Sequence, residues 1–198
     1  MQSGCKMAEA RSRYIPRSLS HAWGQASEQF PVLLLTGPRQ VGKTTLLQKL
    51  CGKDRRYVTL DDPTLRSLAR VEPALFLERF EPPVLIDEIQ YAPQLLPHIK
   101  MAVDSLRKPG RFWLTGSQQF HMMKGVSETL AGRVAILNLV GLSTRERFKQ
   151  RLDVEPFVPS ARCIAERTAS GRSLTLKQLY RIIWTGGFPA LASGRVRD

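Results

Sequence analysis

The feature that most constrains this chain is a glycine-rich loop, residues 37–44, between an apolar run and a helical pattern. The loop reads GPRQVGKT and matches G-x-x-x-x-G-K-[ST], the phosphate-binding loop of nucleoside triphosphatases. Val32–Leu35 before it has the length of a strand, and leucines recur at helical spacing after it. The two glycines allow backbone N–H groups to turn onto phosphate oxygens, at the positive end of the following helix. A chance glycine-rich turn rarely has this context, so the sequence predicts a triphosphate site.

Two residues at the end of this loop carry distinct chemistry. The ammonium of Lys43 would reach the β- and γ-phosphates of ATP, and the Thr44 hydroxyl would help to hold Mg²⁺. Arg39 is exposed by its position in the loop, where its guanidinium could face the nucleotide, a partner or only solvent. ATP and Mg²⁺ are therefore the expected ligands.

A second apolar run ends in two adjacent carboxylates. Asp87 and Glu88 follow Val84–Ile86, which has the length of a buried strand. A carboxylate on the last residue of a strand can reach the metal shell, and the next residue can address the attacking water. We therefore assign Asp87 as the magnesium ligand, through a water molecule, and Glu88 as the general base. The alternative is an ordinary acidic pair that caps a helix.

Polar residues beside two further strands complete the predicted site. Ser117, with Gln118 as a second choice, follows an apolar strand, where its side chain could contact the γ-phosphate; a turn stabilised by the hydroxyl is the alternative. Arg133 precedes the last strand. Its guanidinium could stabilise charge at the γ-phosphate of its own nucleotide, or of a neighbour's in a homo-oligomer. A surface arginine or an internal ion pair fits the spacing equally well.

Short apolar strands alternate with helical patterns along most of the chain. The expected strands are residues 32–35, 56–60, 84–88, 111–117 and 134–140. The expected helices are residues 18–28, 44–50, 63–70, 73–80, 93–103, 119–130 and 174–184. Five strands separated by helices indicate an α/β fold with a parallel sheet buried on both faces. Ser18 is the expected N-cap of the first helix, and Asp62, before Pro63, that of the third.

The pattern changes near residue 142, and we divide the chain there. We expect a flexible leader over 1–13, the α/β domain over 14–142, and the start of a helical region over 143–198. No run approaches the roughly 20 apolar residues that span a bilayer, and the N-terminus lacks the apolar core of a signal peptide. The 3 cysteines form no C-x-x-C pair and read as cytosolic thiols. We therefore expect a cytoplasmic protein with no membrane partner.

The formal net charge of +13 is unusual for an ATPase. Residues 61–100, which contain the two carboxylates, are acidic on balance, and nearly everything around them is basic. Such a balance favours nucleic acid as a partner, through neutralisation of its phosphates. A solvated basic surface, or an interface for an acidic region, is equally consistent, because net charge argues only for nonspecific association.

The chain resembles the AAA-like P-loop ATPase family of bacteria and archaea, whose members typically append a C-terminal domain of unknown function. The resemblance covers roughly residues 14–190 and rests on five motifs in the right order. They are GPRQVGKTTLL, YVTLDDPTLRSLA, VLIDEIQYAPQLLPHIK, RFWLTGSQQF and ETLAGRV, followed by a later GGFP. The resemblance implies an additional-strand fold, in which another strand separates the P-loop strand from the strand of Asp87. It implies ATP binding by Gly37, Pro38, Arg39, Gln40, Val41, Gly42, Lys43, Thr44 and Thr45.

The same resemblance assigns roles to residues outside the loop. Asp87 and Glu88 match the Walker B pair, Ser117 matches the sensor position, and Arg133 falls in the family's A-G-R. Asp61 and Asp62 fall in its L-D-D, whose role does not follow from the sequence. Members of the family continue for a large further domain after GGFP. We therefore expect the output of that missing C-terminal domain either to be absent or to lie outside residues 1–198.

Three functions compete for this sequence. The leading one is an ATPase module that acts as a motor or a switch. The second is a slow, nucleotide-dependent DNA-associated or signalling scaffold. A small-molecule kinase is disfavoured, because Glu88 suits activation of water and no arginine-rich lid sequence lies between the later strands.

Overall fold

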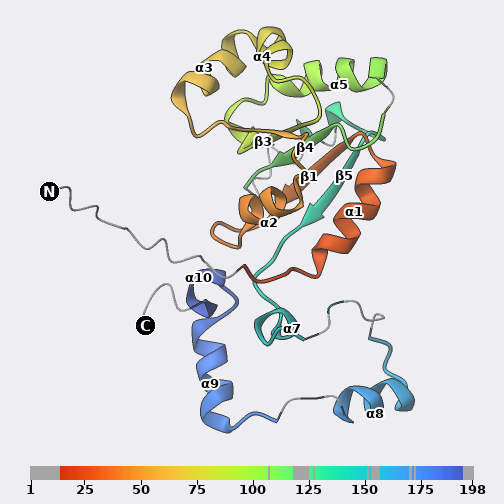
Figure 1. Cartoon of the computed structure of the whole chain (residues 1–198), viewed down its shortest axis with the longest axis vertical. Coiled ribbons are helices and arrows are strands. Elements are labelled where there is room, and N and C mark those ends of the chain that lie inside the picture. Colours follow the sequence, from red (N-terminus) through yellow and green to blue (C-terminus); the bar gives the residue numbers. More distant parts are fainter. Residues whose placement is uncertain are drawn as a thin grey trace, which may run out of the picture.

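A five-stranded parallel sheet forms the centre of the protein, in the order β2-β3-β4-β1-β5 (Figure 1). The computed structural model describes residues 14–106, 108–117, 125–126, 128–150, 152, 157–169, 171 and 173–193. Its strands are β1 Val32–Thr36, β2 Arg56–Thr59, β3 Val84–Asp87, β4 Phe112–Thr115 and β5 Val134–Asn138. Every neighbouring pair is parallel, and β4 lies between β1 and β3. The predicted α/β fold and the separation of the P-loop strand from the acidic strand are therefore confirmed.

Helices cover both faces of this sheet (Figure 1). Those before β5 are α1 Leu19–Gln29, α2 Lys43–Leu50, α3 Pro63–Val71, α4 Pro73–Arg79, the 3-10 turn η1 Ile89–Tyr91 and α5 Leu95–Leu106. Alternate residues of β1 face opposite layers, as the pleat of a strand requires. Val32 and Leu34 pack in the core that α3, α4 and α5 cover. Leu33 and Leu35 pack in the core that α1 and α2 cover.

Burial along the strands explains why their apolar runs are continuous. Every residue of β1, β3 and β4 is buried, whereas the edge strands β2 and β5 are partly exposed. Central strands of a parallel sheet are covered on both faces and need apolar residues at each position. On one face, Trp23 of α1 meets Trp113 of β4 edge to face, with ring centroids 5.3 Å apart. This packing holds α1 against the face of the sheet that Leu33 and Leu35 also line.

The two predicted helix caps had different outcomes. Asp62 caps α3 as expected, because its carboxylate accepts from the backbone N–H groups of Thr64, at 2.8 Å, and Leu65, at 3.1 Å. The prediction for Ser18 was wrong, since its backbone is already helical and its side chain makes no capping bond. The Ser18 N–H instead donates to a carboxylate oxygen of Glu146, 2.7 Å away. A contact across 128 residues has taken the place of a local cap.

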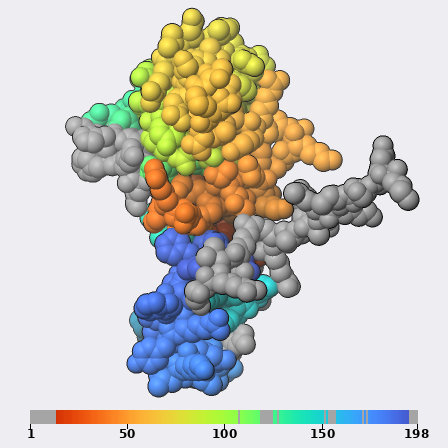
Figure 2. Space-filling view, turned by 90° about the vertical axis from the view of Figure 1, so that its left-hand side faces the viewer, coloured from red at the N-terminus to blue at the C-terminus, as the bar shows by residue number. Residues whose placement is uncertain are grey.

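The helices after β5 lie below the sheet and return to it at their end (Figures 1 and 2). They are α7 Thr144–Arg147, α8 Ala161–Ala169, α9 Leu176–Thr185 and α10 Pro189–Ala192. The predicted amphipathic helix over 174–184 is present as α9, whereas α8 lies in a stretch too weakly periodic to predict. The predictions for residues 1–13, and for most of a helix over 119–130, fall outside the described residues. No helix in the described part of the chain has the length and hydropathy needed to cross a membrane.

Candidate functional site

The phosphate-binding loop packs closely on the segment that follows β5. Gly37 has a φ of 143°, and a Cβ added there would lie 2.1 Å from the carbonyl oxygen of Leu139. Gly42 has a φ of 94° in the left-handed region and stands as the N-cap of α2. Only glycine tolerates both demands at Gly37, the unusual backbone and the close approach. The motif therefore fixes the path of the loop from the end of β1 to the first turn of α2.

Replacing Gly37 with alanine should distort the loop, because the new methyl group would overlap the Leu139 carbonyl. We expect the melting temperature to fall and nucleotide binding to weaken together. Gly52→Ala is the matched control, since nothing lies within 4 Å of a Cβ at Gly52. Thermal melts and nucleotide titrations check both variants. Equal behaviour of the two alanine variants would contradict this account of the loop.

Lys43 begins α2 and lies across the loop. Its Nζ donates to the carbonyl oxygens of Gly37, at 3.0 Å, and Pro38, at 2.9 Å. Burial lowers the pKa of Lys43 from its ordinary value, and the negative charges of Glu88 and Asp87 partly oppose that fall. The structure thus places a buried ammonium group in the loop, between its backbone and two carboxylates.

Asp87, the last residue of β3, is the best-connected carboxylate of the site. It is 4% exposed, and Thr44 Oγ1 lies 2.9 Å and 3.0 Å from its two oxygens. Tyr57 of β2 donates its hydroxyl to Asp87 at 3.1 Å, and Thr115 of β4 also donates to it. Burial, followed by the charge of Asp87, raises the pKa of Tyr57 to about 12, so this hydroxyl remains a donor at neutral pH. Asp87 is therefore held from both neighbouring strands and from the P-loop helix.

Tyr57 and Thr115 were missed in the sequence, where they read as ordinary strand residues. The signal that could have found them is the strand order, because the ends of β2 and β4 flank the end of β3. Thr115 ends β4 beside Asp87, whereas Tyr57 lies in the middle of β2, opposite Leu85, and reaches the Asp87 carboxylate with its long side chain.

Glu88 lies just outside β3, although the sequence predicted that the strand would include it. Its φ is 60°, in the left-handed region that few residues other than glycine adopt. Its backbone N–H donates to Thr115 Oγ1 at 3.1 Å, and its carboxylate accepts from the side chain of Gln90. The turn in the backbone directs Glu88 into the cleft beside Lys43.

A cleft of about 410 Å³ opens above the loop and gathers most of the predicted residues. Its lining is Arg39, Gln40, Gly42, Lys43, Thr44, Thr45, Asp61, Glu88 and Tyr91. Asp61 of the L-D-D motif thus belongs to the cleft, whereas Asp62 caps α3. A smaller pocket adjoins the cleft at Gly42 and Thr45. Its other lining residues are Tyr14, Ile15, Arg17, Val41, Leu142, Pro189, Ala190 and Ser193.

Ser117, its alternative Gln118 and Arg133 are the predicted residues that remain to be placed. Ser117 follows β4 at the same edge of the sheet as Asp87, and its buried Oγ has no hydrogen-bond partner among the described residues. Gln118 lies outside the described residues. Arg133 lies at the opposite edge, where its carbonyl accepts from Val32 N–H at the start of β1. Its guanidinium pairs with the exposed carboxylate of Asp104, with Nε 2.5 Å from Oδ1. The structure therefore does not bring Arg133 to the cleft.

The residues of the cleft fit a magnesium ion that is bound together with phosphate. Among the described residues, no group of three or more His, Cys, Asp or Glu side chains could hold a metal alone. The Thr44 hydroxyl and the Asp87 carboxylate are nevertheless in contact and offer the oxygen ligands that Mg²⁺ prefers. Thr44 would hold Mg²⁺ directly and Asp87 through a water molecule, and phosphate and further water oxygens would complete the shell, as is usual for Mg²⁺.

A P-loop between β1 and α2, with an acidic strand two places away in a parallel sheet, defines a P-loop ATPase of the additional-strand class. A family model described as an AAA domain matches residues 29–148, and the chain belongs to that family. The uncharacterized protein Rv2008c of Mycobacterium tuberculosis is 40% identical over 123 residues, 62% of this chain. The uncharacterized protein Mb2031c of Mycobacterium bovis matches equally well. The match spans only 28% of the length of each relative.

Solved structures share the fold at low sequence identity. A Walker-type ATPase of Pyrococcus abyssi superposes with a TM-score of 0.56 at 16% identity, over 92% of this chain and 67% of its own. AMPPCP-bound DnaA from Aquifex aeolicus gives 0.51 at 17% identity, over 89% and 57%. Domain III of the Thermotoga maritima replication initiation protein DnaA gives 0.51 at 18% identity, over 91% and 82%. These similarities concern the fold.

Proposed function

We propose that this chain binds Mg-ATP in the cleft above the P-loop and hydrolyses it to ADP and phosphate, as a motor or switch module. The observation that carries the proposal is the contact of Thr44 with Asp87, 2.9 Å between oxygen atoms. This contact joins the end of the P-loop, which follows β1, to the end of the acidic strand β3, although β4 lies between β1 and β3. A phosphate-binding loop and a carboxylate in contact through a hydroxyl are the parts that ATP hydrolysis needs.

Each residue has a separate task in this proposal. The P-loop amides and Lys43 bind the β- and γ-phosphates, and Thr44 and Asp87 hold Mg²⁺, which neutralises phosphate charge when bound. Glu88 takes a proton from water as the water oxygen bonds to the γ-phosphorus. The bond from that phosphorus to the bridging oxygen breaks, and ADP keeps this oxygen. Ser117 contributes its hydroxyl, which has no partner among the residues that the structure describes, to the γ-phosphate.

The adjoining pocket suits the base of the nucleotide. Tyr14, Ile15 and Pro189 give it an apolar lining, and it meets the phosphate cleft at Gly42. Arg133 takes part only in the arrangement in which it contacts a neighbouring subunit's nucleotide, since it lies at the far edge of its own sheet. In this proposal the ATPase domain spans residues 14–142, and a helical region begins at residue 143.

The net charge of +13 favours one second candidate, a slow nucleotide-dependent scaffold on DNA. ATP turnover measured with and without DNA, at low and at physiological salt, distinguishes the two. A DNA-associated protein should bind duplex or single strands at low salt with little sequence preference, and lose affinity steeply as salt rises. Steady turnover without DNA supports the ATPase module. The absence of DNA binding at low salt would exclude the second candidate, a scaffold on DNA.

A further inference from the structure

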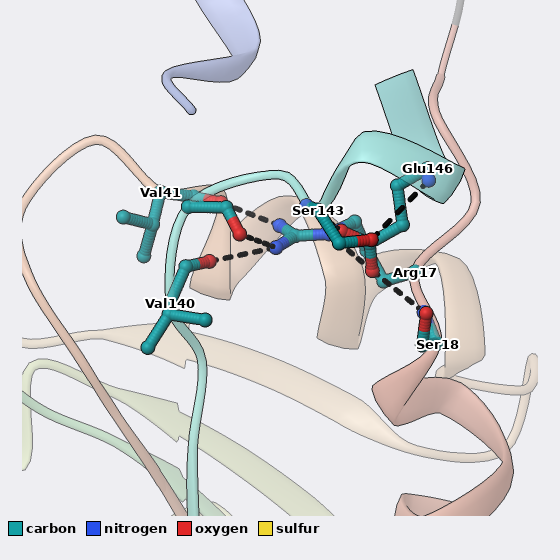
Figure 3. Close-up of polar contacts among 7 residues, drawn as sticks. Arg17, Ser18, Val41, Val140, Ser143 and Glu146 are labelled. Carbon is teal, nitrogen blue, oxygen red and sulfur yellow. Dashed lines mark hydrogen bonds and ion pairs between the residues drawn. The ribbon is translucent and has the colours of Figure 1, made fainter. Parts of the chain in front are cut away.

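One arginine beside the nucleotide cleft is buried although it does not line the phosphate site. Arg17 precedes α1 and is 5% exposed. Its Nη1 donates to the carbonyl oxygen of Val41 in the P-loop, at 2.7 Å (Figure 3). Its Nη2 donates to the carbonyl oxygens of Val140, at 2.7 Å, and Gly141, at 3.3 Å, after β5. The guanidinium thus joins the P-loop to the segment that leaves the sheet.

Glu146 of α7 holds this arginine in place. Its Oε1 lies 3.2 Å from Arg17 Nε, and the pair is almost fully buried. The same carboxylate accepts from the N–H groups of Ser18 and Ser143, both at 2.7 Å (Figure 3). Burial alone would raise the pKa of Glu146, but these two N–H groups and Arg17 lower it below its usual value. Glu146 therefore remains ionised at neutral pH, and we call this pair the Arg17–Glu146 clamp.

Contacts continue from the clamp to the GGFP segment. Arg147, next to Glu146, donates to the carbonyl oxygen of Gly186 at 2.8 Å and to Thr185 Oγ1 at 2.6 Å. The N–H of Leu142 donates to the carbonyl oxygen of Gly187 at 2.6 Å. A Cβ at Gly187 would lie 2.9 Å from the nitrogen of Leu142, so only glycine fits there. The GGFP segment is therefore docked on residues 141–147, and α10 after it reaches the pocket beside Gly42.

We propose that Arg17 is a positioning residue for nucleotide binding, and that the clamp couples the shape of the P-loop to the docking of the GGFP segment on residues 141–147. The inference rests on the proposed function, since it concerns the same nucleotide site. Arg17 can hold the Val41 carbonyl in one place only while its other contacts, to residues 140–146, are made. A buried arginine that loses part of this set is left with unpaired donors, which is costly. Loop shape and docking therefore favour one another.

Coupling of this kind is reciprocal. If docking of the GGFP segment raises nucleotide affinity by some factor, bound nucleotide must favour docking by the same factor. Bound nucleotide should therefore stabilise the contact of Arg147 with Thr185, at the end of α9, although α9 does not line the cleft. The coupling can therefore be measured both as nucleotide affinity and as protection of the docked segment.

Three variants test the inference from different sides. Arg17→Lys keeps the charge but lacks the planar fork that reaches several carbonyls at once. Glu146→Gln keeps the shape of the carboxylate and loses its charge. Gly187→Ala displaces the docked segment and leaves both charges in place. The matched control is Arg162→Lys, because Arg162 forms an exposed ion pair with Glu166 on α8, 2.8 Å long.

Two readouts are needed, Kd for Mg-ADP from fluorescent-nucleotide titration and hydrogen exchange of the full chain with and without Mg-ADP. In the wild type, nucleotide should slow exchange of the Leu142 amide. In the three variants we expect Kd to rise by about tenfold, within the usual range of coupling between sites. The slowing at Leu142 should be lost, while amides of β1 and β4 keep their protection. Arg162→Lys should behave as the wild type.

The outcomes separate this inference from the proposed function. Wild-type affinity and wild-type slowing at Leu142 in all three variants would overturn the clamp and leave the nucleotide site intact. Loss of protection throughout β1 and β4 would show a general folding role and overturn it too. If Arg17→Lys fails to fold, Gly187→Ala decides alone, because it retains the ion pair. No binding of nucleotide by the wild type would overturn the proposed function itself, and the clamp's role with it.

Discussion

Replacing Lys43 with alanine should remove most of the affinity for ATP. The motif predicts only that Lys43 binds phosphate. The structure shows in addition that its ammonium is buried and donates to the carbonyl oxygens of Gly37 and Pro38. No other lysine lines the cleft, within the part of the chain that the structure describes. Without it, the β- and γ-phosphates would keep the backbone amides, Arg39 and the proposed Mg²⁺ but lose the one lysine in the described lining of the cleft. Hydrogen bonds to charged groups contribute about 1.5–3 kcal/mol each, so we expect Kd to rise at least tenfold.

Fluorescent-nucleotide titration measures this change, with circular dichroism to confirm that the variant is folded. Lys53→Ala is the matched control, because it removes the same charge from an exposed position beyond α2. It should leave Kd unchanged. Wild-type affinity in Lys43→Ala would remove the P-loop assignment.

Local patterns were sufficient to predict the fold and the position of the phosphate-binding loop in it. Continuous apolar runs mark the strands that both layers of helices bury, and the GPRQVGKT loop places its own residues without help from the rest of the chain. Asp62 caps α3 with neighbours two and three residues away, so its role is also local. Such features depend only on spacing, and spacing is what a sequence displays.

The features that sequence analysis missed depend on contacts between distant segments. Tyr57 reaches Asp87 only because β2 and β3 are neighbours. Ser18 gives its N–H to Glu146 instead of capping its own helix with its side chain. Arg133 was predicted to be a site residue because it is adjacent to a strand. It precedes β5, however, and the strands begin at the end of the sheet that faces away from the cleft. All strands of the sheet are parallel, so the cleft lies at the carboxyl ends of all of them. Asp87 ends its strand and reaches the cleft, whereas Arg133 precedes its strand and does not.

The GGFP motif shows how a resemblance gains a physical meaning. In the sequence it marks only the end of the similarity. In the structure, Gly187 contacts Gly141 so closely that a side chain on it would overlap the backbone of Leu142. The motif therefore docks on residues 141–147: backbone contact requires glycine at Gly187, whereas the positive φ of 59° favours glycine at Gly186.

The two adjacent carboxylates should respond differently to loss of charge. Glu88→Gln keeps size and hydrogen bonding but cannot take a proton from water. We expect it to bind Mg-ATP as the wild type does and to lose hydrolysis by a factor of about 10² or more, the usual scale for removing a general base. Asp87→Asn removes the charge beside Thr44, so magnesium-dependent binding should weaken along with turnover.

Asp87 and Glu88 are adjacent in the sequence, but their different contacts predict different effects of the two substitutions on stability. Three hydroxyls, from Thr44, Tyr57 and Thr115, donate to Asp87, and an amide group at that position would offer them one acceptor fewer. Asp87→Asn should therefore also lower the melting temperature, whereas Glu88→Gln should not, because the Glu88 side chain is only half-buried and lines the open cleft. Mg-ATP affinity and single-turnover hydrolysis, measured below both melting temperatures, decide the roles. Normal hydrolysis by Glu88→Gln would exclude Glu88 as the base and favour the slow switch. If Asp87→Asn also bound and hydrolysed Mg-ATP normally, the acidic strand would have no part in catalysis, because a buried carboxylate held by three hydroxyls would then serve the fold alone.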